Sequence, residues 1–151
     1  NWKQESLLRL TPLQEEDSAI DRIVKFAKHT QATFHNDHLI KKRCGWIIDT
    51  ANFNNDDKNY TSKAFFSIVP NSPGHKKIVK KILPKGMYLE IFFQGSYFQN
   101  AKRIREKINK FINANDLYIA GDVYVLPIDN HWFSKNSDEY ITKIFMHVKE
   151  K

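Results

Sequence analysis

Residues 60–69, YTSKAFFSIV, align without gaps on residues 140–149, YITKIFMHVK, with Tyr, Lys and Phe coinciding at three positions. Both stretches are rich in the β-branched and aromatic residues that favour strands. Internal similarity of this kind is typical of one supersecondary unit used twice. The two stretches therefore predict a duplicated fold, in which each forms the last strand of its copy.

The residues before the first stretch predict the rest of the first copy. A short apolar run over residues 6–10 predicts a strand. Asp17 and Ser18 then offer a helix N-cap, and an apolar stripe at helical spacing predicts a helix to about residue 31. That stripe consists of Ile20, Ile23, Val24 and Ala27. Residues 43–53 predict a strand that forms a hairpin with residues 60–69.

The same order recurs before the second stretch. Residues 87–93 predict a strand, residues 98–113 a helix, and residues 117–128 and 139–148 a second hairpin. The apolar stripe of this helix is Ala101, Ile104, Ile108, Phe111 and Ile112. We therefore predict an α+β fold: a duplicated βαββ repeat with a curved antiparallel sheet, helices on one side and a central ligand groove. The whole chain, 1–151, is one domain, with repeats over about 5–70 and 84–150.

Composition excludes several classes of function. No run approaches the ~18 apolar residues of a membrane span, and the lone Cys44 excludes an internal disulfide, which fits a cytoplasmic protein. The net charge of +7 comes from scattered Lys and Arg, which favours solvated faces over a nucleic-acid stripe. The histidines show no metal spacing, so we expect no metal or cofactor and a surface position for each. These histidines are His29, His35, His38, His75 and His147.

Several short motifs, taken in order, resemble a known family. They are Lys85-Gly86-Met87-Tyr88, Asn115-Asp116-Leu117, Asp122-Val123-Tyr124 and Asp138-Glu139-Tyr140, and more loosely Gly45 and Asp56 to Tyr60. This series resembles the GyrI-like (effector-binding) family, and in particular the effector domain of MerR-family multidrug-responsive transcription activators. The resemblance implies a GyrI-like, SHS2-type fold and a small-molecule (drug or metabolite) sensor domain of a bacterial transcription regulator. DNA would then be bound only through a separate domain, no membrane is implied, and a homodimer is one assembly that this allows.

Two other functions fit the same family. A stand-alone GyrI-like protein acts by protein interaction, as gyrase inhibitors do, and a few members are small hydrolases that use a groove glutamate and tyrosine. The sequence offers no Ser/His/Asp or Cys/His signature, and Glu90 with a neighbouring tyrosine is the one acid or base that could serve. We therefore do not expect an enzyme.

The resemblance also implies a ligand site. In the multidrug sensors an aromatic cage surrounds a buried carboxylate, and the matching position here is Val125, directly after Tyr124. Without that anion a cation has nothing to offset its desolvation, so cation specificity does not carry over. Tyr60, Tyr88 and Tyr140 match positions that line or border the pocket. Trp46 is expected to replace a cage wall that is missing at Cys44, since residues two apart share a strand face.

Glu90 is the candidate for the missing negative charge. Strand alternation places Tyr88, Glu90 and Phe92 on one face, so Glu90 faces the groove if Tyr88 does. The alternative is an edge glutamate in solvent, or one paired with a nearby lysine. The loop His131-Trp132-Phe133 is expected to be a lid or a partner contact, or else to fold back onto its own sheet. The expected ligand is a small aromatic or lipophilic molecule.

Overall fold

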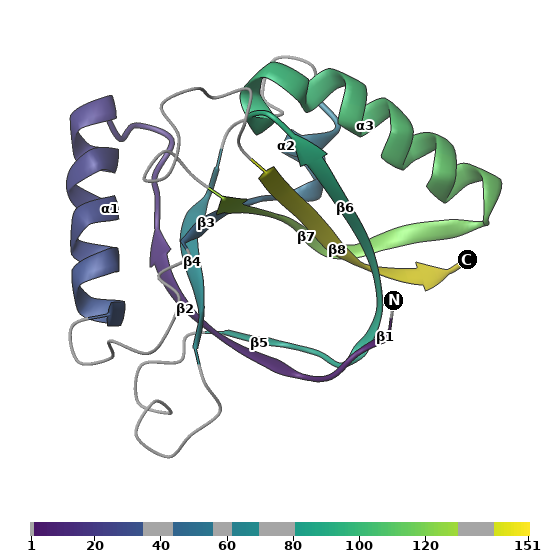
Figure 1. The fold of residues 1–151 in the computed structure, drawn as a ribbon, viewed down its shortest axis with the longest axis horizontal. Helices are drawn as coiled ribbons and strands as arrows, with labels where there is room; N and C mark the ends of the chain where they lie inside the picture. Colours follow the sequence, from purple (N-terminus) through teal and green to yellow (C-terminus); the bar gives the residue numbers. More distant parts are fainter. Residues whose placement is uncertain (1, 35–43, 56–61, 70–80, 130–140) are drawn as a thin grey trace.

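One curled antiparallel sheet carries the fold, and the two long helices lie on its outer side (Figure 1). The computed structural model describes residues 2–34, 44–55, 62–69, 81–129 and 141–151. The elements are β1 (Trp2–Lys3), β2 (Ser6–Pro12), α1 (Ala19–Phe34), β3 (Gly45–Ile48), α2 (Thr50–Phe53), β4 (Ala64–Val69), β5 (Lys81–Leu83), β6 (Gly86–Gln94), α3 (Tyr97–Ala114), β7 (Leu117–Asp129) and β8 (Ile141–Glu150).

The strand order confirms the duplication. It runs β1-β6-β8-β7-β3-β4-β2-β5, so the two halves mirror each other about the contact between β7 and β3. One copy is β2-α1-β3-β4 and the other is β6-α3-β7-β8. Both predicted hairpins form, β3 with β4 and β7 with β8. The predicted α+β fold with a curved antiparallel sheet is therefore correct.

The short strands β1 and β5 join the two ends of this sheet. β1 pairs with β6, and β2 pairs with β5, in one common antiparallel register that runs from Trp2↔Met87 to Leu8↔Lys81. β1 leads into β2, and β5 leads into β6. The segment β1–β2 therefore pairs with the segment β5–β6 at both edges of the sheet. The sheet consequently curls round until its ends meet, as the lower part of Figure 1 shows.

Alternation along each strand separates two cores. The outer core lies between the sheet and α3, and it contains buried α3 residues together with Leu89, Ile91 and Phe93 of β6. The inner core fills the inside of the curl, and none of its described members belongs to a helix. It consists of Leu8, Ile47, Ala64, Phe66, Leu83, Tyr88, Tyr124, Leu126 and Phe145. Any ligand that enters the curl therefore meets the inner core.

The two helices contact the sheet in different ways. In α3 the predicted stripe is buried, apart from the half-exposed Phe111. In α1 the predicted stripe faces solvent instead: Ile23 is 67% exposed, and Ile20 and Val24 are also exposed. The opposite side of α1 makes polar contacts, in which Arg22 donates to the Gln14 carbonyl oxygen (3.0 Å). The stripe thus identified the helix but not the side of it that packs.

His29 corrects the expectation that the histidines lie at the surface. Its ring is buried on the sheet-facing side of α1, with Nδ1 2.7 Å from the Thr11 hydroxyl and Nε2 2.8 Å from the Ser67 hydroxyl. Burial is the main cause that lowers the pKa of His29 to about 4, and the charge of Arg9 lowers it further. The imidazole is consequently neutral at pH 7. His35 and His38, like His75, lie outside the described residues.

Two local predictions along the chain also need correction. The strand expected over residues 43–53 ends at Ile48, because Asp49 Oδ1 accepts a hydrogen bond from the Asn52 N–H (2.7 Å) and caps α2. The gapless alignment of the repeats is one residue out of register. It equates Phe65 with Phe145. Phe65 packs on Phe26 of α1, however, and the β4 ring that shares the inner core with Phe145 is Phe66. A one-residue shift moves a side chain to the other face of a sheet.

Candidate functional site

The inner face of β6, β8 and β7 brings aromatic and charged side chains together. Residues paired across neighbouring strands share a face, and the pairs here include Glu90↔Phe145, Phe92↔Lys143 and Tyr124↔Phe145. The rings of Tyr124 and Phe145 stack with centroids 5.0 Å apart and planes at 10°. Phe66 meets Tyr124 edge to face at 5.3 Å. These rings form the centre of the inner face.

Glu90 lies beside this cluster and is paired with two lysines. Its side chain is 9% exposed, and its Oε1 forms ion pairs with Lys3 of β1 and with Lys143 of β8, the latter at 2.8 Å. The Lys143 Nζ also lies 5.1 Å from the centroid of Phe145. We call Lys3, Glu90 and Lys143 the ion triad. Glu90 therefore faces the inside of the curl and is paired with lysines. It combines features of both alternatives that the sequence left open.

A second charged group lies at Tyr124. Asp122 forms ion pairs with Lys63 (2.8 Å) and with Lys81 (3.0 Å). The Lys81 Nζ lies 5.7 Å from the centroid of Tyr124. Desolvation lowers the pKa of Lys81, but hydrogen bonding to Tyr124 and Asp122 outweighs it, so the pKa is raised on balance. The ammonium group is therefore fully charged at pH 7.

Phe92 marks the exposed end of the inner face. Its side chain is 58% exposed, and Ile141 beside it on β8 is also exposed. Tyr88, two residues earlier on the same face, is 2% exposed and donates a hydrogen bond to the Pro84 carbonyl oxygen (2.7 Å). Burial raises the pKa of Tyr88 to about 12. A molecule arriving from solvent thus reaches Phe92 and the ion triad before it reaches the buried rings.

The predicted site residues divide into three groups. Tyr88, Glu90, Phe92 and Tyr124 share the inner face, as alternation predicted for the first three. Trp46 and Val125 are paired with each other and belong to the outer core, where Trp46 stacks on Phe98 at 5.6 Å. They therefore lie on the outer face of the sheet and not with the other four, because each is next to an inward-facing residue along its strand. Tyr60 and Tyr140 lie outside the described residues, as does the loop His131-Trp132-Phe133.

Sequence reasoning missed several charged and aromatic members of the inner face. Lys143 and Phe145 were quoted in the repeat, and the period of two in β8 was the signal that could have placed them with Glu90. Asp122 and Tyr124 share a face by the same rule. Lys3 had no such signal, since it reaches Glu90 only because β1 pairs with β6, far along the chain.

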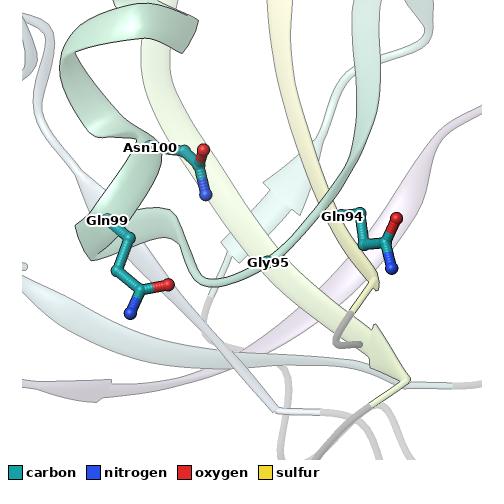
Figure 2. Close-up of a pocket in the computed structure, with 4 residues that line it drawn as sticks. All are labelled: Gln94, Gly95, Gln99 and Asn100. Carbon is teal, nitrogen blue, oxygen red and sulfur yellow. The ribbon is translucent and has the colours of Figure 1, made fainter. Parts of the chain in front are cut away.

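A surface hollow lies where β6 passes into α3, lined by Gln94, Gly95, Gln99 and Asn100 (Figure 2). Its polar groups are used locally. Asn100 donates to the Ser96 carbonyl oxygen (2.8 Å), and the Ser96 hydroxyl accepts from the Gln99 N–H (3.3 Å) as the N-cap of α3. The hollow contains neither a charged nor an aromatic lining residue. We therefore assign it to the capping of α3 and not to a ligand.

The described residues were also compared with what a metal site and a membrane-spanning helix require. Within the described part of the chain, no group of three or more His, Cys, Asp or Glu side chains is arranged to hold a metal ion. Among the same residues, neither long helix has the length and apolarity that crossing a bilayer requires.

The comparisons with known proteins identify the fold. No family model matches the sequence, and no curated protein matches it. The structure is similar to the crystal structure of the EcmrR C-terminal domain, with a TM-score of 0.64 and 16% identity over 100% of this chain and 96% of that chain. It is also similar to EcmrR in the cryo-EM structure of an EcmrR–DNA complex, with a TM-score of 0.68 and 14% identity over 100% of this chain. This chain spans 56% of the EcmrR chain in that complex. The fold is thus that of the EcmrR C-terminal domain, as the sequence resemblance predicted.

Proposed function

We propose that this chain is an effector-binding domain that senses a small aromatic molecule as part of a transcription regulator. One observation carries the proposal: the exposed ring of Phe92 lies next to the ion triad on the inner face. Ligand sites combine apolar and aromatic walls with a few convergent polar groups. Phe92 supplies a ring on which a planar ligand stacks, and the triad supplies charges that select it.

The proposal that the sensor belongs to a regulator rests on the structural neighbour. EcmrR has been determined in a complex with DNA, and this chain matches 56% of its length. The basic residues here are scattered, and four of the lysines are turned to Asp122 and Glu90 inside the curl. We propose that DNA is bound by another part of such a regulator and that this domain reports ligand binding to it.

The chemistry of the inner face favours a sensor over a hydrolase. General acid–base catalysis needs a side chain that can exchange a proton with the substrate near neutral pH. Glu90 is held by two ammonium groups, and burial raises the pKa of Tyr88 to about 12. Burial likewise raises the pKa of the Cys44 thiol to about 12, which keeps it protonated and unreactive. The inner face is therefore better suited to holding a ligand than to transforming it.

The test is ligand binding with and without the ring of Phe92. Isothermal titration against a panel of naphthalene derivatives is expected to give one-to-one binding. Phe92→Ala should weaken binding about fivefold, because stacking on an aromatic ring contributes on the order of 1 kcal/mol. The matched control is Phe111→Ala, which removes a half-exposed ring from the outer side of α3 and should leave binding unchanged. Equal losses in both variants, or no binding by any derivative, would contradict the proposal.

A further inference from the structure

The charges on the inner face are unequal. Among the described residues, four lysines meet there with two carboxylates: Lys3 and Lys143 at Glu90, and Lys63 and Lys81 at Asp122. Each carboxylate is thus shared by two ammonium groups. Like charges brought together out of water repel each other, and an opposite charge nearby stabilises them. Among the described residues, these ion pairs therefore contain more positive than negative charge.

The aromatic rings are also in contact with cations of the protein itself. The Nζ atoms of Lys3 and Lys143 lie 5.7 Å and 5.1 Å from the centroid of Phe145, and the Nζ of Lys143 lies 5.7 Å from that of Phe92. A cation gains energy by lying over a ring face within about 6 Å. Lysines already hold these positions, so a ligand cation would have to displace an ammonium group and remain beside it.

Exposure determines which charge an incoming molecule meets. The Lys3 side chain is 33% exposed and that of Lys143 is 16% exposed, whereas Glu90 beneath them is 9% exposed. A ligand stacked on Phe92 therefore reaches the two ammonium groups before the carboxylate. Desolvation, together with the charge of Lys3, lowers the pKa of Lys143 although Glu90 opposes this. A second anion at the triad would relieve that repulsion.

We infer that the ligand is an aromatic organic anion, which stacks on Phe92 and places its acidic group against Lys3 and Lys143. The inference rests on the proposed function and names the ligand class for the same site. It assigns Glu90 the role of holding the two lysines together while the site is empty, and not that of binding a cation. Charge-assisted hydrogen bonds from ammonium to carboxylate or sulfonate oxygens are among the stronger contacts available to a small ligand.

The experiment uses three probes that share one ring system: 2-naphthoate, 2-naphthamide and (2-naphthylmethyl)trimethylammonium. Isothermal titration should show that naphthoate binds at least tenfold more tightly than the amide, with the ammonium compound weakest. Lys143→Gln should weaken naphthoate about tenfold and leave the amide unchanged, and Lys3→Gln, at a more exposed position, should do the same. Glu90→Gln should tighten naphthoate, because it removes the competing carboxylate.

The controls change the same charges elsewhere. Lys102→Gln and Glu106→Gln lie on the exposed side of α3 and should leave all three affinities unchanged, which excludes an effect of net charge. If the ammonium compound bound most tightly and lost this affinity in Glu90→Gln, the inference would be overturned, but the proposed sensor function would not. Equal binding of all three probes, still dependent on Phe92, would do the same. Binding of none of them at millimolar concentration would overturn both the inference and the proposed function.

Discussion

At the scale of single residues, one rule determines which face of the sheet each candidate site residue occupies. Alternation along β6 placed Tyr88, Glu90 and Phe92 together, and the structure agrees. Val125 was placed in the pocket by resemblance although it directly follows Tyr124, and neighbours on a strand face opposite sides. The contact of Lys3 with Glu90 depends on the pairing of β1 with β6, and local patterns carry no information on that pairing.

His29 predicts a specific dependence of stability on pH. Its pKa in the folded protein is about 4, against 6.5 for an unperturbed histidine, so the unfolded chain binds more protons between these pH values. The free energy of unfolding should therefore fall as pH decreases from about 6.5 to 4, by up to about 1.4 kcal/mol per pH unit. Urea unfolding of His29→Gln across this range should lack that slope, whereas His147→Gln should retain most of it. An unchanged slope in His29→Gln would show that another group is responsible.

Gly45 predicts a steric limit at the centre of the sheet. A Cβ atom at this position would lie 2.2 Å from the Val125 carbonyl oxygen and 2.7 Å from the Phe66 ring. Gly45→Ala should therefore destabilise the protein by about 1–3 kcal/mol, measured by urea denaturation. The double variant Gly45→Ala/Phe66→Leu should not recover this loss, since the nearer obstacle is backbone. Full recovery would identify the ring as the obstacle instead.

At the scale of elements, the two helices show what hydrophobic periodicity can and cannot predict. It located both α1 and α3 to within a few residues. In α3 the stripe is also the packed side, whereas α1 turns its stripe to solvent. The other side of α1 contacts the sheet through a polar residue, His29, and through the ring of Phe26. A helical period shows that one side of a helix is more apolar than the other. Which side packs on the sheet depends on the side chains of the sheet that it contacts.

The different exposure of the two apolar stripes can be tested with one isoleucine substitution in each helix. Ile108 of α3 is fully buried and Ile23 of α1 is 67% exposed. Ile108→Ala should cost about 2–5 kcal/mol in the free energy of unfolding, because it leaves a cavity in the outer core. Ile23→Ala should change it by less than about 0.5 kcal/mol. Chemical denaturation of the two variants measures the difference, and a large loss in Ile23→Ala would show that the stripe is covered in solution.

At the scale of the whole molecule, the two copies exchange short strands and so depend on each other: the strand that precedes each copy pairs with the first strand of the other. β1 precedes the first copy and pairs with β6 of the second, while β5 precedes the second copy and pairs with β2 of the first. The sequence predicted the duplication from one long strand in each copy. It did not predict the exchange, because strands of two and three residues leave no detectable pattern.

This exchange predicts how fragments behave. When the chain is divided between β4 and β5, neither half should show a cooperative thermal transition alone, because each lacks the strand that completes its edge. Mixing the halves should restore a transition, followed by circular dichroism. A cooperative transition in either isolated half would show that the copies are independent units.

The joining of the sheet's two ends also governs how the protein is made. Leu8 meets its partner Lys81 only after the chain between them has been synthesised, which at ~5–20 residues per second means a delay of several seconds. During that time the inward-facing rings of the first copy, such as Phe66, are without the second copy that buries them. Contacts so distant in sequence also slow folding. We therefore expect the first copy to expose apolar surface, and to be prone to aggregation, until the second copy has been made.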